Sequence, residues 1–352
     1  MVNARRQLAG TCYACYDGLL VLGQAYVEHL RGDVSARNAC LTEALTWSKE
    51  RGTPYFFRWM VAGMPVMFSA AIDEKIETEY VQSLIRSWRV RPPALAAADW
   101  PWPFRIHVLG GFKVFRDSLP LRFNRKAPAR LLEFLKLLAS RGGASVSAAY
   151  IKHSLWPDGD GDAADGAFTN ALHRLRKLLG DDEVILLSDG QVSINDRICQ
   201  LDLWEFESLC SEVTELARSR DPSIEQVTTY VDKLLGLYSG HVLGSEAPSW
   251  AAEGREKARS AFERSVAVLG STLENLGEWQ TAATLYQRGI EVDGLAEQFY
   301  RQLMVCQKSL DNRAQATETY RRLRDMLSIV LGLKPSPETR AVFESLTSTE
   351  VR

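Results

Sequence analysis

The chain has 352 residues, of which 46% are hydrophobic and 24% are charged, and its formal net charge is −2. At roughly 100 to 200 residues per domain, this length predicts two or three domains. The composition is typical of a soluble globular protein and excludes the collagen-like, disordered and disulfide-scaffold classes. Because the net charge is close to zero, a surface for nucleic acid must be confined to one part of the chain.

The first part of the chain has the apolar spacing of helices. From residue 11 to residue 88, apolar side chains recur at intervals of three and four, with breaks at Gly32 and Gly52. This pattern predicts tetratricopeptide-like helical hairpins with helices of about 15 to 20 residues. Prolines then become dense and favour extended backbone, at Pro92, Pro93, Pro101 and Pro103. We therefore expect a helical segment over residues 1–92 and a Pro/Trp-rich linker over residues 93–103.

Residues 104–198 change from strand patterns to helix patterns and back. Period-two alternation predicts strands, three-and-four spacing predicts helices, and Ser147 is a candidate N-cap. The expected elements are strands over 104–109, 112–115 and 121–123, helices over 127–139, 147–155 and 163–179, and a hairpin of 184–187 with 191–194. The predicted order is thus a small sheet, three helices and a hairpin.

Residues 199–352 return to a helical pattern that repeats. Leu276, Ala282 and Tyr286 recur as Leu310, Ala316 and Tyr320, each 34 positions later. This is the period of tetratricopeptide hairpins, which must stack on one another to bury their apolar faces. We expect a mainly α protein with a small α+β domain in the middle and helical-repeat domains on both sides.

The sequence shows no catalytic or cofactor motif. It lacks a phosphate-binding glycine loop, a nucleophile elbow and a zinc-protease motif, and its five histidines are far apart. It also lacks a signal peptide and the roughly 20-residue apolar run of a membrane span. We therefore expect a cytoplasmic protein that is not an enzyme and binds no cofactor, metal or membrane.

Two motifs resemble parts of metal sites, but each lacks other residues that such a site requires. Cys12 and Cys15 are close in sequence, but no second pair at knuckle spacing completes a zinc site, so two buried thiols are the better interpretation. Asp158, Asp160 and Asp162 alternate as in a calcium loop, but the positions that need glycine and glutamate do not hold them. An acidic loop that caps the next helix explains these carboxylates.

The predicted helix 163–179 is amphipathic in an informative way. Its apolar side chains fall on one stripe at 100° per residue, while its opposite side carries Thr169, Asn170, His173, Arg174 and Lys177. Asparagine and arginine can bond base edges, and arginine and lysine can bind phosphate. A solvated polar face would show the same pattern, so the helix by itself leaves both readings open.

Charge counted by segment favours the nucleic-acid reading. Residues 104–198 hold 14 Lys and Arg against 11 Asp and Glu, a net charge of +3 that leaves −5 for the remainder of the chain. The acidic residues cluster in two loops, whereas basic residues dominate 122–136, Lys152 and 174–177. Such a distribution is expected where one face meets phosphates.

Several motifs in this order resemble one family. The segments 109–112 (LGGF), 155–158 (LWPD) and 173–180 (HRLRKLLG) are similar to the OmpR-type winged helix of the SARP transcriptional activators. The segment 237–243 (LYSGHVL), with Trp250, Arg255, Tyr320 and 331–335, resembles the bacterial transcriptional activator domain that accompanies it. The resemblance covers residues 101–346. The residues before Pro92 resemble the end of a MalT-type tetratricopeptide array.

The resemblance implies a bacterial DNA-binding transcriptional activator. It implies that helix 163–179 docks in the major groove of double-stranded DNA, and that the C-terminal domain helps the protein dimerise on direct repeats and recruit RNA polymerase holoenzyme. On this reading Arg125, Lys126, Arg174 and Lys177 bind phosphates, while Thr169, Asn170 and His173 choose the sequence. The domains are then 1–92, 93–103, 104–198 and 199–352.

One feature departs from the family. The predicted wing tip, residues 188–191, has no Lys or Arg, and Gln191 stands where an aromatic residue is usual. This makes a minor-groove contact by the wing doubtful, with Arg197 as a weak substitute. A different class of protein also fits the sequence: a tetratricopeptide-type scaffold whose middle domain is vestigial and binds no DNA.

Overall fold

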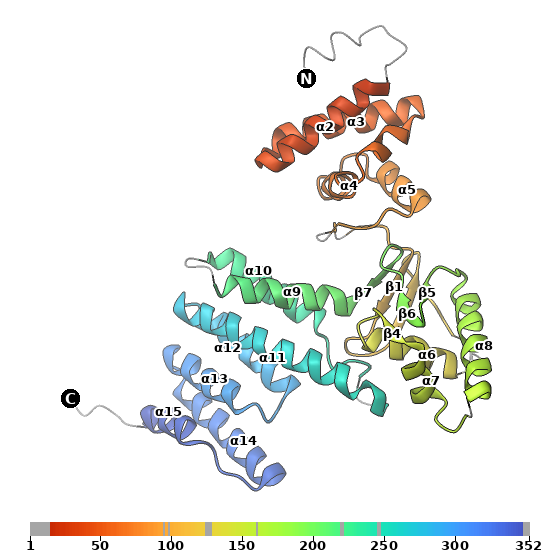
Figure 1. The fold of residues 1–352 in the computed structure, drawn as a ribbon. Helices are drawn as coiled ribbons and strands as arrows, with labels where there is room; N and C mark the ends of the chain where they lie inside the picture. The colour runs from red at the N-terminus through yellow and green to blue at the C-terminus, as the bar shows by residue number, and fades with distance from the viewer. Residues whose placement is uncertain are drawn as a thin grey trace.

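The computed structural model describes residues 15–93, 96–97, 99–123, 129–159, 161–218, 222–244 and 248–347. The molecule is mainly helical, with a small sheet region between an N-terminal helical group and a C-terminal helical layer (Figure 1). This confirms the predicted fold class. None of the helices in the described ranges has both the length and the apolarity that a bilayer crossing requires.

The N-terminal helices pack around a core of their own. Gly32 and Gly52 have φ angles of 77° and 61° and break the helical run where the sequence predicted. The elements are α2 (Cys15–Arg31), α3 (Val34–Arg51), a 3-10 helix (Pro54–Trp59), α4 (Met64–Asp73) and α5 (Thr78–Trp88). The predicted helix length of about 15 to 20 residues is right for α2 and α3 but wrong for the 10-residue α4 and 11-residue α5. Lys75 and Glu77, both at positive φ, end the helical run between α4 and α5.

The first sheet has four strands in the order β3-β2-β1-β7. They are β1 (Phe104–His107), β2 (Lys113–Arg116), β3 (Leu119–Pro120) and β7 (Cys199–Leu201). The predicted third strand over 121–123 is wrong, because Asp117 and Ser118, both at positive φ, form a tight turn that pairs Leu119 with Arg116. Strand β7 was not predicted. It lies parallel to β1, which requires a long crossover that local sequence does not reveal.

Three helices and a hairpin follow the first strands as predicted. The helices are α6 (Ala129–Ser140), α7 (Ala148–Leu155) and α8 (Gly161–Leu179), and the second sheet contains β4 (Val146–Ser147), β5 (Ile185–Ser188) and β6 (Gln191–Ile194). Ser147 is the predicted N-cap, since its hydroxyl accepts a 3.1 Å hydrogen bond from the Tyr150 amide. The predicted helix start at Ala127, Asp160 of the acidic loop, and Cys12 lie outside the described residues.

The C-terminal helices confirm the 34-residue repeat. They are α9 (Asp202–Leu216), α10 (Ile224–Leu237), α11 (Ala252–Asn275), α12 (Trp279–Val292), α13 (Glu297–Ser309), α14 (Arg313–Leu331) and α15 (Pro337–Thr347), with a 3-10 turn at Ser249–Ala251. α11 and α13 end 34 residues apart, and α12 and α14 begin 34 residues apart. Ala282 and Ala316 are both fully buried at equivalent positions, as stacked hairpins require.

Buried apolar side chains fall into two large groups. One contains N-terminal residues from Val21 to Trp100. The other runs without interruption from Phe104 in β1 to Leu327 in α14, and so joins the middle segment to the C-terminal helices. Residues 104–201 contain the small sheet, the three helices and the hairpin, and we call them the winged-helix unit after the domain that the sequence predicts. The domain limits given by the sequence stay predictions.

Candidate nucleic-acid interface

Helix α8 lies at the edge of the molecule, on the side away from the C-terminal helices (Figure 1). Its inner side packs on α6 and α7, with the rings of Phe134 and Phe168 5.6 Å apart. The buried residues of α8 are those that the helical periodicity placed on the core stripe: Ala164, Phe168, Ala171, Leu172, Leu175 and Leu179. The sequence therefore determined correctly which side of α8 faces inward.

The outer side of α8 carries five of the predicted site residues, and all five are exposed: Thr169, Asn170, His173, Arg174 and Lys177. No ion pair joins Arg174 or Lys177 to another residue in the part of the chain that the structure describes. Their cationic groups are therefore available to an external anion. Whether they contact DNA stays a prediction.

Two other basic residues near this face are engaged within the protein. Arg176 donates two hydrogen bonds, from Nε and Nη2, to the carbonyl oxygen of Ile185, at 2.9 and 2.6 Å. Lys152 on α7 forms an ion pair with Asp165 on α8. Arg176 thus fixes the first strand of the hairpin to α8, and Lys152 ties α7 to the beginning of α8. The sequence pattern counted both as basic residues of the face and gave no sign of these roles.

The remaining predicted basic cluster is only partly described. Arg125 and Lys126 lie outside the described residues. Arg130 forms an ion pair of 2.9 Å with Glu133, and the Lys136 ammonium lies 5.4 Å from the ring centre of Phe112. These two cations are therefore already partnered. Arg122, which is exposed, forms no ion pair within the described ranges, as is also true of Arg174 and Lys177 on α8.

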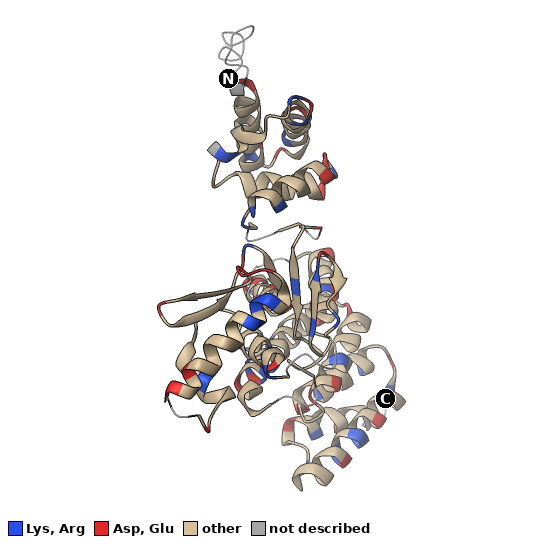
Figure 2. Cartoon of the chain, turned by 90° about the vertical axis from the view of Figure 1, so that its right-hand side faces the viewer, with Lys and Arg blue, Asp and Glu red and all other residues tan. Residues whose placement is uncertain are grey.

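Charge along α8 is polarised. Its acidic residues lie at the N-terminal end and its basic residues toward the C-terminal end (Figure 2). This arrangement complements the helix dipole and so stabilises the helix itself. The positive charge that remains for a ligand is consequently concentrated in the last two turns, around Arg174 and Lys177.

The hairpin of β5 and β6 forms a wing beside α8. Asp189 and Gly190 have φ angles of 51° and 71°, the left-handed pair that a two-residue hairpin turn prefers. Asp189 is exposed, and the Ser188 hydroxyl donates a 3.1 Å hydrogen bond to its carboxylate. The tip therefore presents a negative charge. Leu186 and Leu187, in the strand that leads to the tip, are exposed.

The winged-helix unit is held to the C-terminal helices at the end of β1. The carboxylate of Asp202, the first residue of α9, accepts hydrogen bonds of 2.9 Å from the amides of Val108 and Leu109. Burial raises the pKa of Asp202, although these amides favour its ionised form. The Ser239 hydroxyl donates a 2.7 Å bond to the Leu109 carbonyl, and the Gly110 amide donates a 3.0 Å bond to the His241 carbonyl. The two motifs 109–112 (LGGF) and 237–243 (LYSGHVL) therefore contact each other through these hydrogen bonds.

Comparison with known proteins adds to this geometry. Residues 201–347 match the family model of the bacterial transcriptional activator domain. The regulatory protein AfsR of Streptomyces griseus is 27% identical to this chain over 250 residues, which are 70% of this chain and 25% of that protein. The chain resembles the SARP-family transcriptional activators. It spans about a quarter of the length of AfsR.

A solved structure shares the fold. Mycobacterium tuberculosis EmbR, in complex with a low-affinity phosphopeptide, aligns with a TM-score of 0.51 and 21% identity, covering 69% of this chain and 65% of that one. At this level of identity the likeness concerns the fold. It agrees with the arrangement described above, a small sheet region followed by a layer of repeat-like helices that forms the activator domain.

Proposed function

We propose that this chain is a SARP-type transcriptional regulator that binds double-stranded DNA through α8. The observation that carries the proposal is the single exposed stripe of Thr169, Asn170, His173, Arg174 and Lys177, opposite a stripe that is buried in the core. A helix with these side chains has the shape and the donors needed in the major groove. The likeness to AfsR and the activator-domain match support transcriptional regulation, and neither points to an enzyme family.

In this proposal phosphate contacts supply affinity and base contacts supply sequence choice. Arg174 and Lys177 bind phosphates, together with Arg125 and Lys126, which lie outside the described residues. Thr169, Asn170 and His173 lie nearer the N-terminus of α8 and meet base edges. Each good base contact contributes about 1 to 3 kcal/mol of discrimination. The wing contributes little, because its tip carries Asp189 and no cation.

The activator domain supplies the other half of the proposed function. Its helical layer dimerises the protein on direct-repeat sites and recruits RNA polymerase holoenzyme. The hydrogen bonds between the 109–112 and 237–243 motifs support this, because they fix the position of the layer relative to α8. A polymerase bound to the layer is then held at a set distance from the promoter site.

Loss of one phosphate contact tests the role of α8. In fluorescence anisotropy with duplex DNA, Lys177→Ala should weaken binding to every sequence and lower the slope of log K against log salt by about 0.9. Lys334→Ala is the matched control, since Lys334 is an exposed lysine beyond α14. Equal binding by parent and Lys177→Ala would reject the α8 interface. Failure of the parent to bind any DNA at low salt would favour the scaffold alternative.

Loss of one base contact tests the specificity. Selection of bound fragments from a random DNA pool should give a consensus for the parent protein and a consensus relaxed at one base pair for Asn170→Ala. Thr214→Ala serves as the control, because Thr214 is exposed on α9, on the other side of the sheet. Identical consensus sequences for all three proteins would remove Asn170 from the base-reading set.

A further inference from the structure

A large cavity lies where three parts of the chain meet. Its volume is about 850 Å³, within the range of sites that hold drug-sized molecules. One wall is formed by described residues at the start and end of the linker and just before it, the second by β7 and by α9 as far as Glu212, and the third by the end of α10. The charged and tryptophan side chains that line it, all within the described ranges, are Arg91, Trp102, Asp196, Trp204, Glu205, Glu212 and Lys233.

The walls of the cavity are mostly apolar and are fixed in place. Two prolines, two alanines, two tryptophans and three leucines line it. The Trp204 indole N–H donates a 2.5 Å hydrogen bond to the Gly142 carbonyl, and Trp102 packs beside the buried Trp100 at a ring distance of 6.4 Å. The amide of Ala97 donates a 2.7 Å bond to the Ser69 hydroxyl on α4, which holds the linker wall. A ligand would therefore meet a preformed site.

The charges in the cavity do not cancel. Arg91 forms an ion pair with Asp196, so these two groups neutralise each other. Glu205 accepts a hydrogen bond from the neutral Gln200 side chain, and burial together with the nearby Glu212 raises the pKa of Tyr230. The positive charge of Arg105, which does not line the cavity, also acts on Glu205. Among the side chains that line the cavity, the three carboxylates of Asp196, Glu205 and Glu212 outnumber the two cations, Arg91 and Lys233.

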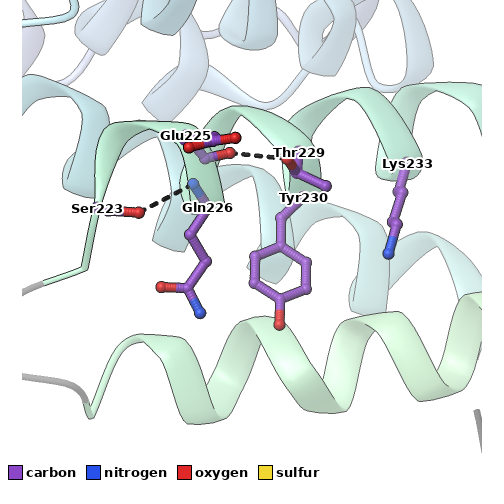
Figure 3. A pocket seen from close by; sticks show the side chains of 6 residues that line it. All are labelled: Ser223, Glu225, Gln226, Thr229, Tyr230 and Lys233. Atoms are coloured by element: carbon purple, nitrogen blue, oxygen red, sulfur yellow. Dashed lines mark hydrogen bonds between the residues drawn. The ribbon is translucent and has the colours of Figure 1, made fainter. Parts of the chain in front are cut away.

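Lys233 lies at the end of the cavity and does not close it. A shallower pocket of about 360 Å³ runs along α10 and shares this residue. Gln226, Tyr230 and Lys233 project from α10 toward the neighbouring helix (Figure 3). No ion pair joins Lys233 to another residue within the described ranges, and it is exposed. Lys233 therefore adds one positive charge at this end of the cavity, and the side chains of the lining keep a net charge of −1.

We infer that this cavity binds a small organic cation with an apolar, ring-sized body. The excess of carboxylates over cations in the lining attracts a positive group, and the rings of Trp102 and Trp204 add a cation–π attraction. The apolar walls accommodate the rest of the molecule. The inference does not rest on DNA binding. A ligand in this position would touch the linker and the activator domain together, and would thereby fix where the N-terminal helices stand relative to α8.

Fluorine NMR of the full chain labelled with 5-fluorotryptophan tests the site directly. The chain has nine tryptophans, and single Trp→Phe variants assign the signals of Trp102 and Trp204. Titration with benzyltrimethylammonium should move these two signals most, with half-saturation on the order of 1 mM for a probe of this size. The neutral isostere neopentylbenzene and the anion phenylacetate should bind at least several-fold more weakly.

A matched pair of variants tests the charge recognition. Glu205→Gln should weaken binding of benzyltrimethylammonium about tenfold. Glu225→Gln should leave binding unchanged, because Glu225 is an exposed carboxylate on α10 outside the cavity. No movement of either tryptophan signal in the parent protein would overturn the site. Preference for phenylacetate, or equal affinity of the Glu205 variant, would overturn the assignment to cations.

Discussion

The winged-helix unit is joined to its two neighbours in different ways. Toward the activator domain the buried core is continuous, and main-chain groups of residues 108–110 bond to Asp202, Ser239 and His241. Toward the N-terminal helices the cores are separate, and Arg89 and Arg91 form exposed ion pairs with acidic residues of the winged-helix unit. Buried hydrogen bonds are costly to break, whereas exposed ion pairs contribute little and are screened by salt.

This difference predicts two mechanical behaviours in one chain. The winged-helix unit and the activator domain should move as one body, so that α8 and the helical layer keep a fixed geometry. The N-terminal helices should reorient at low cost about the linker, unless a ligand in the cavity beside it holds them. Substitutions that disrupt the two junctions should therefore differ in their effects, with the largest at the junction with the activator domain.

The largest effect is expected at Asp202. Asp202→Ala leaves the buried amides of Val108 and Leu109 without an acceptor, and should lower the free energy of unfolding by about 3 kcal/mol. Chemical denaturation followed by circular dichroism measures this loss. Asp232→Ala is the control, because Asp232 is exposed on α10. Equal stability of the two variants would contradict the tight junction.

Gly254 on α11 provides a second way to break the same junction. A Cβ at this position would lie 2.1 Å from the carbonyl oxygen of Ser140 at the end of α6, so the two elements cannot stay this close once a methyl group is added. Gly254→Ala should lower the free energy of unfolding by about 1 to 3 kcal/mol. Gly236→Ala on α10, where a Cβ meets open space, should not destabilise the protein. A stable Gly254→Ala variant would show that the contact is looser than described.

At the N-terminal junction, Arg89→Ala should change geometry and leave stability nearly unaltered. Arg89 pairs with Asp181, at 2.9 Å, and with Glu183, and all three side chains are partly exposed. We expect a loss of at most about 1 kcal/mol. Spin labels on α3 and α8 should show a broader distance distribution, as should the parent protein in high salt. Arg86→Ala, an exposed arginine on α5, should leave the distribution unchanged. An unchanged distribution for Arg89→Ala would place the restraint elsewhere.

The smallest effect concerns pH. Burial, aided by Arg255 and Arg259, lowers the pKa of His241 below its usual 6.5. The unfolded chain therefore binds more protons here, so His241 contributes stability that is present above pH 6.5 and is lost as the pH falls through the folded pKa. His241→Gln should flatten the decline in stability below neutral pH. His153→Gln, at an exposed position, is the control. An unaltered decline in the His241 variant would assign the effect to other groups.

Local sequence signals predicted an element correctly where the contacts that define it join residues close in sequence. The Ser147 cap, the hairpin turn at Asp189 and Gly190, and the buried stripe of α8 all follow from contacts between residues close in sequence. Strand β7 did not follow, because its partner β1 lies almost a hundred residues earlier. The third strand was misplaced because non-glycine residues at positive φ, Asp117 and Ser118, form its turn.

In the candidate site, too, local sequence predicted some features, while others depend on contacts with distant segments. Periodicity put Asn170, His173 and Lys177 on the outer side of α8, and each is exposed. Periodicity also placed Arg174 and not Arg176 on that side, whereas the charge count of residues 174–177 included both arginines. Only the position of the Ile185 carbonyl shows that Arg176 is a structural residue. Whether the exposed residues read DNA awaits the binding experiments.

The sequence alone determined the three helices and the hairpin of the middle segment, the 34-residue repeat and which side of α8 faces inward, because these depend on spacing and on short-range hydrogen bonds. The tertiary structure decided which charges remain free, which junction is firm, and that a cavity lies between Trp102 and Trp204. Such features arise from contacts between segments far apart in the chain. Their partners are set by packing, which no local pattern records.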